Sequence, residues 1–510
     1  MQFNAMVRTV RIVRALPFVL LVTLLAALFA WANVALTQIG LDTYRNSTSQ
    51  HQTQVEPDTF SAGPDEFSSN SRIVMVTQTG RFFDGGASNI AWASSQDGGS
   101  TWTGGNLPGI TRIDNPNNPY DRVSDPSVTY DARRGKWLIS SLALNNAQGG
   151  GVSGVAVLTS ISTDATGLNW LPPVIVTSLG DVDKNWIVCD NTRTSPFYGN
   201  CYTQWDDFGN VDKIYMSTST DGGFTWGPRK SPQRSPHGLG GQPVVQPNGT
   251  VIVPIDNANE TAVGAFRSSN GGQTWSSVVT IATISDHTVA GGLRSGPLPS
   301  AEIDGSGKVY VVWQDCRFRS QCSSNDIVMS TSTNGINWSA ISRIPIDSTT
   351  SGVDHFIPGL AVDKNTSGNG AHLVLTYYYY PVANCTLFTC QLQVGSVSSA
   401  DGGASWSGPV AVAGPMALSW LPNTNQGRMV GDYISTSFNA GGTAHGAFPV
   451  ANAPTGGTDC ATATPNCDQA TYTETSGQTL ATGLLRTVDL AAFPNAASDH
   501  AAPQSALKRR

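Results

Sequence analysis

The segment SQDGGSTW at residues 95–102 decides the fold, because variants of it recur along the chain. An Asp-Gly or Asn-Gly pair supplies the positive φ angles of a tight hairpin turn. The Asp or Asn side chain can accept backbone N–H bonds across that turn. The Trp that ends each copy is large and apolar, so we expect it in the core beneath the turn. The other copies are STDATGLNW (162–170), STDGGFTW (219–226), SSNGGQTW (268–275), STNGINW (332–338) and SADGGASW (399–406).

Predicted strands surround each copy of this hairpin motif. A short apolar stretch leads into the turn, as in VAVL at 155–158 and KIYM at 213–216. Between the copies lies a second repeat, in which a strand ends in Asp, a Gly turn follows and another strand begins. PSVTYD at 126–131 followed by GKWLI at 135–139 is an example. Each period therefore holds about four strands, which is one blade of a β-propeller.

Six periods predict an all-β fold, a six-bladed β-propeller of four-stranded antiparallel blades over residues 71–450. Strands from 71–102 and 428–450 would share one blade, so that N- and C-terminal strands close the ring and remove the exposed sheet edge. A stack of sandwich domains and a β-helix are the competing architectures. Successive motif Trp residues are 49 to 68 positions apart. That spacing is shorter than an Ig-like domain of ~100 residues and longer than one β-helix coil.

The N-terminal segment predicts export. Residues 1–36 combine Arg8, Arg11 and Arg14 with an apolar run, which is typical of a signal peptide cut after AWA at 30–32, or of an uncleaved membrane anchor. Either way the rest of the chain is expected outside the cytoplasm, secreted or anchored at the cell surface. We interpret residues 37–70 as a polar linker and 451–510 as an Ala/Thr/Gly-rich C-terminal extension.

The cysteines support export. An even number of cysteines in an exported chain predicts local disulfides, although eight cysteines allow 105 pairings. No CxxC doublet or HxxxH pattern accompanies them, which disfavours a metal site. The four close couples are Cys189/Cys201, Cys316/Cys322, Cys385/Cys390 and Cys460/Cys467.

Composition limits the partners. Charged residues make up 13% of the chain, the net charge is −7 and no basic stripe is present, so nucleic acid is not an expected partner. We expect a monomer that needs no catalytic cofactor. The oxygen-rich pair Asp206 and Asp207 is a candidate for a structural Ca²⁺.

The repeated Ser-x-Asp-x-Gly-x-Thr-Trp segment resembles the Asp-box, or BNR repeat, of the sialidase (neuraminidase) superfamily. The resemblance implies an exo-α-sialidase-type glycoside hydrolase that removes terminal sugars from glycoconjugates. In that family three Arg side chains clamp the sugar carboxylate, a Tyr activated by a Glu is the nucleophile, and an Asp is the acid/base. Guanidinium groups bind carboxylates bidentately, and a phenol replaces the usual carboxylate nucleophile.

Propeller sites surround the central funnel, where the inner strands begin, and the chain offers few candidates there. Asp183, Lys184, His355 and Asp432 stand at such positions without an assigned role. Structural interpretations remain open, since Asp125 can cap the turn before Pro126, Glu302 can form an ion pair and Tyr433 can be a core aromatic. The resemblance implies Asp125, Glu302 and Tyr433 as catalytic residues, and Arg122, Arg294 and Arg428 as substrate-binding residues.

A second functional interpretation stays open. The family's Arg-Ile-Pro motif does not precede the first hairpin motif; it occurs here only at 343–345. The alternative is a non-catalytic propeller that binds glycan or protein at the cell surface. An enzyme needs an Arg cluster facing a Tyr–Glu couple and an Asp, whereas a binding protein needs only aromatic and amide side chains.

Overall fold

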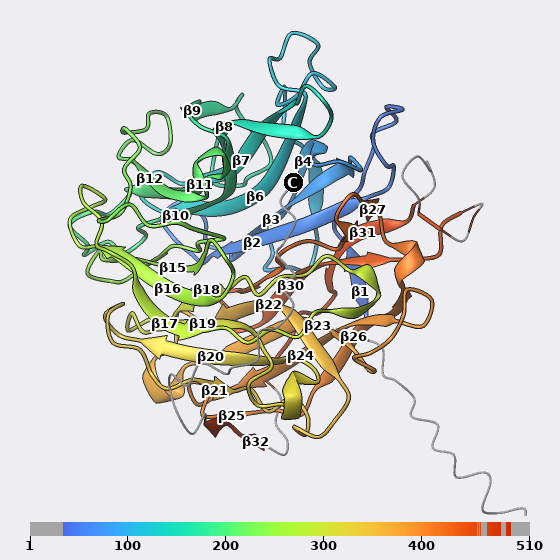
Figure 1. Cartoon of the computed structure of the whole chain (residues 1–510). Helices are drawn as coiled ribbons and strands as arrows, with labels where there is room; N and C mark the ends of the chain where they lie inside the picture. The colour runs from blue at the N-terminus through green and yellow to red at the C-terminus, as the bar shows by residue number, and fades with distance from the viewer. Residues whose placement is uncertain (1–33, 456, 458, 461–466, 481–485, 491–510) are drawn as a thin grey trace, which may run out of the picture. The chain divides into compact units, whose positions relative to one another are not determined.

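The computed structural model describes residues 34–455, 457, 459, 460, 467–480 and 486–490 (Figure 1). This part of the chain is all-β, and its helical segments are short 3₁₀ turns of three residues. No helix in it has the length and apolar character needed to cross a membrane. The 3₁₀ turns are η1 (Phe208–Asn210), η2 (Ala290–Gly292), η3 (Ser320–Cys322), η4 (Gly368–Gly370) and η5 (Leu418–Trp420).

The hairpin motif folds as its residues dictate. In the first copy, Gly98 and Gly99 have φ angles of 72° and 103°. The Asp97 carboxylate accepts the Thr101 N–H at 2.8 Å, and the Trp102 indole N–H donates to the Gly99 carbonyl at 3.0 Å. The side-chain oxygen of Asp97 and the indole of Trp102 therefore fix the two sides of one turn.

The third copy of the motif permits a test of this turn. The Asp221 carboxylate accepts bonds from the Thr225 backbone and hydroxyl at 2.9 and 2.6 Å. Asn270 makes the same backbone bond, to Thr274 at 3.0 Å, in the next copy. Asp221→Ala should therefore lower the free energy of unfolding by about 1 to 2 kcal/mol, while Asp221→Asn stays within about 0.5 kcal/mol, as measured by urea unfolding. Equal losses in the two variants would contradict this role.

The sheets are unequal in size: five separate blades of three to five strands accompany one sheet of eight strands. The eight-stranded sheet contains β2 (Gln54–Ala62), β3 (Arg72–Arg81), β4 (Ala87–Ser95), β5 (Thr103–Asn106), β6 (Arg122–Asp131), β7 (Lys136–Asn146), β8 (Val152–Ile161) and β9 (Val174–Thr177).

The first three separate blades follow along the chain. They consist of β10 (Val182–Cys189), β11 (Cys201–Asp207) and β12 (Lys213–Ser219); of β13 (Gly238–Leu239), β14 (Val244–Val245), β15 (Val251–Asn257), β16 (Ala262–Ser268) and β17 (Val279–Thr283); and of β18 (Ser300–Ile303), β19 (Val309–Asp315), β20 (Asp326–Ser332), β21 (Ser342–Arg343) and β33 (Asp489–Leu490).

The remaining two blades and two short strand pairs complete the described sheets. The blades consist of β22 (Asp354–Val362), β23 (Leu373–Tyr380), β24 (Gln391–Ser399) and β26 (Val410–Ala417), and of β29 (Ser435–Phe438), β30 (Ala444–Ala451), β31 (Gln469–Glu474) and β1 (Leu36–Gln38). The pairs are β25 (Ser405–Trp406) with β32 (Arg486–Thr487), and β27 (Asn423–Thr424) with β28 (Gly427–Arg428).

The prediction of six four-stranded blades is wrong, because it counted one blade for each hairpin motif. The blade of β29, β30, β31 and β1 contains no such motif. The first two motif regions share the eight-stranded sheet through a single residue pair, Ala87 with Val123. The strands predicted to close the ring together, from 71–102 and 428–450, belong to different sheets.

A closed series of inner strands can be followed through the contacts between the described sheets. Neighbours in this series contact one another, and β29 returns to contact β2, so the series is closed. The first residues of these strands therefore meet at one end of the axis, and their last residues meet at the other. The series runs β2, β6, β10, β14, β18, β22 and β29.

The predicted boundaries also change. Residues 37–70, interpreted as a linker, contain the buried strand β2, and the expected C-terminal extension contributes β31. Sequence pattern missed β2 because two of its inward positions, Glu56 and Asp58, are carboxylates rather than apolar residues. The predicted signal peptide or anchor falls on residues 1–33, which lie outside the described residues.

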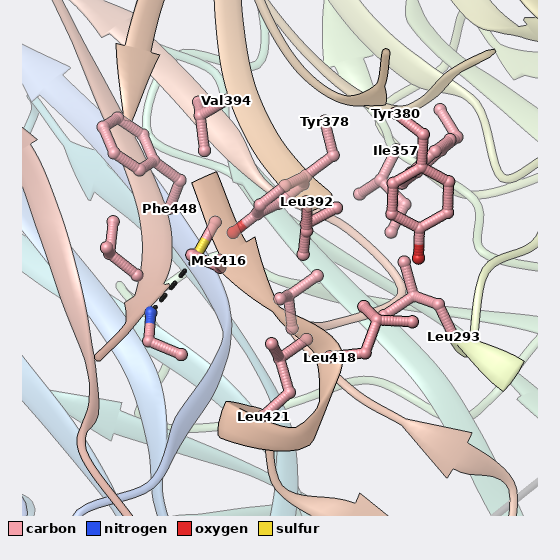
Figure 2. Packing of buried hydrophobic residues seen from close by; sticks show 14 of the residues in the cluster. Leu293, Ile357, Tyr378, Tyr380, Leu392, Val394, Met416, Leu418, Leu421 and Phe448 are labelled. Carbon is pink, nitrogen blue, oxygen red and sulfur yellow. Dashed lines mark hydrogen bonds between the residues drawn. The ribbon is translucent and has the colours of Figure 1, made fainter. Parts of the chain in front are cut away.

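The core is formed by side chains that meet between neighbouring sheets. Figure 2 shows one such cluster, in which Tyr378 of β23, Leu392 of β24 and Phe448 of β30 lie together. The Tyr378 hydroxyl donates a hydrogen bond to the Pro449 carbonyl at 2.5 Å. Burying each large side chain of this kind contributes roughly 1.5 to 3 kcal/mol.

The predicted disulfides are confirmed. All eight cysteines are paired as expected, each pair closing one short loop: Cys189–Cys201, Cys316–Cys322, Cys385–Cys390 and Cys460–Cys467. Four disulfides are consistent with an oxidising, extracytoplasmic compartment.

Candidate functional site

Three inner strands begin with the same backbone irregularity. Glu56 in β2, Asp125 in β6 and Lys184 in β10 have positive φ angles of 54°, 47° and 46°. Each lies where the strand pairing shifts register at a β-bulge. A left-handed conformation costs a non-glycine residue roughly 1 to 3 kcal/mol and persists where the surroundings compensate it. The side chains of these three residues meet in one ion network.

Lys184 is the hub of the resulting ion network. Its ammonium donates a hydrogen bond to Asp432, which precedes β29. It also lies 3.4 Å from an Asp125 carboxylate oxygen and 3.9 Å from a Glu56 oxygen. All four side chains are at most 6% exposed. We call these residues, together with Arg294 and Arg81, the charged cluster.

Two guanidinium groups complete the charged cluster. Arg294 Nε donates to Asp432 at 2.7 Å, while the Arg294 backbone N–H donates to the Arg428 carbonyl. Arg81 donates to the Gly86 carbonyl at 2.8 Å and is buried. The cluster is thus assembled from β2, β3 and β6, from β10, and from the segments that precede β18 and β29.

Burial and neighbouring charges give the acids of the cluster very different pKa values. Burial, followed by the charge of Asp125, raises the pKa of Glu56 to about 8. Burial opposes ionisation of Asp432 as well, but Arg294 and Lys184 outweigh it and hold the Asp432 pKa well below its usual value. At neutral pH Glu56 is therefore a proton donor beside an ionised Asp432. Separated acid pKa values of this kind mark candidate functional sites.

The charged cluster surrounds a small cavity. The lining of this cavity includes the cations Arg81, Lys184 and Arg294 and the acids Glu56, Asp125 and Asp183. The cavity that these side chains border measures about 20 Å³, which holds about one water molecule. Only a small group of a ligand, such as a carboxylate oxygen, fits there, and a sugar ring would have to remain outside.

The structure brings together two of the predicted residues, Asp125 and Arg294, and places Tyr433 beside them. The Tyr433 hydroxyl donates to the Pro126 carbonyl at 3.0 Å, and its ring meets Trp186 edge-on with centroids 5.0 Å apart. Burial, and next the charge of Glu56, raises the Tyr433 pKa well above its usual value. The phenol is therefore protonated, and its role as nucleophile stays a prediction.

The other three predicted residues lie apart from the charged cluster. Arg122 pairs with Asp84 and stacks on the Phe82 ring at 4.1 Å. The Arg428 guanidinium binds Asp459 through two bonds of 2.7 and 3.0 Å. Glu302 lines a larger cavity towards the other end of the inner strands.

Glu56 and Arg81 were not predicted as site residues. Glu56 fell in the expected linker, yet Glu56-Pro57 repeats the Asp125-Pro126 dipeptide that opens β6. Ile357-Pro358 in β22 follows the same pattern, and Ile357 also has a positive φ of 49°. An ionisable residue before Pro at an inner strand was therefore the signal that could have identified Glu56.

One other group has the donor types of a metal site. Oxygen and nitrogen atoms of Asp326, Asp347 and His355 lie within 4.8 Å of one another. Arg319 already binds both carboxylates, and Arg343 binds Asp347 at 2.7 Å. Two guanidinium groups thus neutralise these acids, which disfavours a divalent cation there.

Comparisons with known proteins give one family match. Solved structures are similar at low identity: a protein of unknown function from Dyadobacter fermentans (14% identity, 72% of this chain and 99% of that chain, TM-score 0.43), the NanB sialidase from Streptococcus pneumoniae (14%, 86% and 70%, TM-score 0.40) and the intramolecular trans-sialidase from Ruminococcus gnavus (14%, 80% and 92%, TM-score 0.38). A search of curated proteins gave no match. Residues 143–359 match the family model of the BNR repeat-like domain.

Proposed function

We propose that the chain is an exported glycan-acting enzyme, an exo-glycosidase of the sialidase type that removes terminal acidic sugars. The observation that carries this proposal is the charged cluster, in which Glu56, whose pKa is raised to about 8, and Asp125 lie around Lys184. The BNR repeat-like domain and the four disulfides support a glycan-acting protein outside the cytoplasm.

The cations of the cluster favour an acidic sugar. A sugar carboxylate that reaches the small cavity lies beside Lys184 and Arg294. Arg294 offers the planar guanidinium that suits a carboxylate. A neutral sugar gains none of this interaction, which makes the carboxylate the main determinant of specificity.

The two carboxyl groups supply acid–base chemistry. Glu56 gives its proton to the leaving glycosidic oxygen as the bond from that oxygen to the anomeric carbon breaks. Asp125 beside it accepts a proton from the attacking water, whose hydroxyl oxygen bonds to the anomeric carbon. Because the Glu56 pKa is about 8, activity should be present below that pH and fall above it.

The test is release of a fluorescent aglycone from a synthetic α-sialoside and a β-glucuronide, with a β-galactoside as the neutral substrate. Glu56→Gln and Asp125→Asn should each lower kcat about 10²- to 10⁴-fold. Tyr433→Phe keeps activity if water attacks directly and loses it if Tyr433 is the nucleophile, as the sequence resemblance predicts. Asp459→Asn, outside the cluster, is the control and should keep activity. Release of only the neutral aglycone, or unchanged rates in both cluster variants, would overturn the proposal.

Non-catalytic binding is the second candidate function, and the tightness of the charged cluster favours it. Its small cavity admits one polar group but no sugar ring. Binding of an acidic sugar without aglycone release, lost in Lys184→Met, would identify the chain as a binding propeller.

A further inference from the structure

A second and larger cavity lies further along the same inner strands. Its volume is about 290 Å³, more than ten times that of the cavity at the charged cluster. In β2 and β10 its lining residues, such as Asp58 and Trp186, come after the cluster residues Glu56 and Lys184. Since a strand advances about 3.3 Å per residue, this chamber lies further along the axis than the cluster, towards the last residues of the inner strands.

The chamber has the chemistry of a sugar-binding site. Trp186 is half-buried and lines it, which offers an apolar ring to the face of a sugar. Gln242 also lines the chamber, and its side-chain oxygen accepts a hydrogen bond from the Ala301 N–H at 2.9 Å. Its NH₂ group is a donor that can serve a sugar hydroxyl. The carboxyl groups of Asp58 and Glu302 add acceptors from opposite strands, β2 and β18.

A neighbouring cavity of about 210 Å³ extends the chamber. Both cavities are lined by Phe60, Glu302 and Lys364, so Glu302 lies between them. The Lys364 ammonium lies over the Phe60 ring at 4.5 Å from its centroid, and Lys364 is exposed. The two cavities together offer room for more than one sugar ring, with Lys364 at the side open to solvent.

From this lining we infer that the chamber is a saccharide-binding site, separate from the charged cluster, that takes an uncharged sugar unit of a glycan chain. Size agrees, because pockets for small molecules begin at about 300 Å³. Aromatic, amide and carboxyl side chains match the apolar face and the hydroxyl groups of a sugar. The inference does not depend on the proposed function, because none of its residues belongs to the cluster.

The protonation of the two acids fits an uncharged ligand. Burial raises the Asp58 pKa to about 7. The hydrogen bond that the Asp58 carboxylate accepts from the Val128 N–H at 2.8 Å lowers this pKa, but burial has the larger effect. Burial also raises the Glu302 pKa, which the charge of Lys364 partly offsets. Near neutral pH the Asp58 carboxyl group can both donate and accept hydrogen bonds, as sugar hydroxyl groups do. An anionic sugar gains little here, because Lys364 is the one cation among the lining residues.

The experiment is isothermal titration of the purified exported chain with cellotriose, maltotriose, xylotriose and chitotriose, with trigalacturonic acid as the anionic counterpart. At least one neutral trimer should bind. Glu302→Leu should weaken that binding at least tenfold, because it removes the carboxyl group shared by the two cavities. Glu302→Gln, the matched control, keeps the shape and the hydrogen bonds and should stay within threefold.

Two further variants test the inference. Lys364→Ala changes an exposed residue, and it should weaken binding several-fold without altering thermal unfolding. Lys184→Met changes the charged cluster and should leave neutral-trimer binding unchanged even where hydrolysis is lost. The inference is overturned by absence of binding for all neutral trimers at 10 mM, by tighter binding of trigalacturonic acid, or by equal affinities of Glu302→Leu and Glu302→Gln.

Discussion

Replacing Lys184 with methionine is expected to lower the free energy of unfolding by about 3 to 5 kcal/mol, the effect of removing one partner from a buried ion pair. Lys184 is the cation that both Asp125 and Asp432 contact. Methionine fills a similar volume, so the loss comes from charge rather than from packing. Because Asp432 keeps its bonds to Arg294, the larger effect falls on Asp125, which is left buried without its ion-pair partner.

Urea unfolding followed by tryptophan fluorescence measures this loss. Lys213→Met is the control, since Lys213 is half-buried and its ammonium lies 5.5 Å from the centre of the Tyr215 ring; it should cost less than about 1 kcal/mol. A second variant, Asp125→Asn, removes the acid that loses its partner. If the losses in Lys184→Met and Asp125→Asn add fully in the double variant, the two residues do not interact and the network is incorrect.

Raising the pH from 5 to 8 is expected to destabilise the protein through Glu56. The folded-state pKa of Glu56 is raised to about 8 from an ordinary value of 4.5, so the folded state binds one more proton than the unfolded state between these values. Its contribution to stability is therefore fully present below the ordinary pKa and is lost as the pH rises through about 8. The slope is about 1.4 kcal/mol per pH unit, or on the order of 3 to 5 kcal/mol in total.

Other acids also contribute to the dependence of the unfolding free energy on pH. The contribution of Glu56 is therefore isolated by comparing the parent with a Glu56 variant. Asp58 and Asp286 also have raised pKa values of about 7. Like Glu56, they make the folded protein less stable as the pH rises. Asp432 has a lowered pKa, whose stabilisation is complete above its ordinary value and does not change between pH 5 and 8. Urea unfolding at each pH should give Glu56→Gln a slope shallower than the parent by about 1.4 kcal/mol per unit. Parallel curves would show that Glu56 is ionised throughout.

The charged cluster shows why only part of the site could be predicted. Asp125 and Arg294 were identified because propeller sites lie where inner strands begin. Arg122 stood at a similar position, but its side chain turns to Asp84 instead. The position of a residue near the start of an inner strand can therefore be predicted from sequence. Which acid an arginine there binds depends on distances that only the folded structure sets.

Glu302 shows the same limit in another way. It was grouped with Asp125 by residue type, and the structure places it in a separate chamber with Trp186 and Lys364. Within β2, Glu56 borders the small cavity and Asp58 lines the larger one. A difference of two residues along an inner strand thus moves a carboxyl group from one cavity to the other.

The sequence by itself determined the local structure: the hairpins, their turn glycines, the Trp residues beneath them and the four disulfides. These features depend on contacts between residues that are close along the chain, as in the bond from Trp102 to Gly99. Only the tertiary structure decided how the strands are shared among blades and which charges meet on the axis. Both depend on long-range pairing, such as β1 with β31 and Glu56 with Lys184, and such pairing is fixed by the whole closed arrangement of strands rather than by any local pattern.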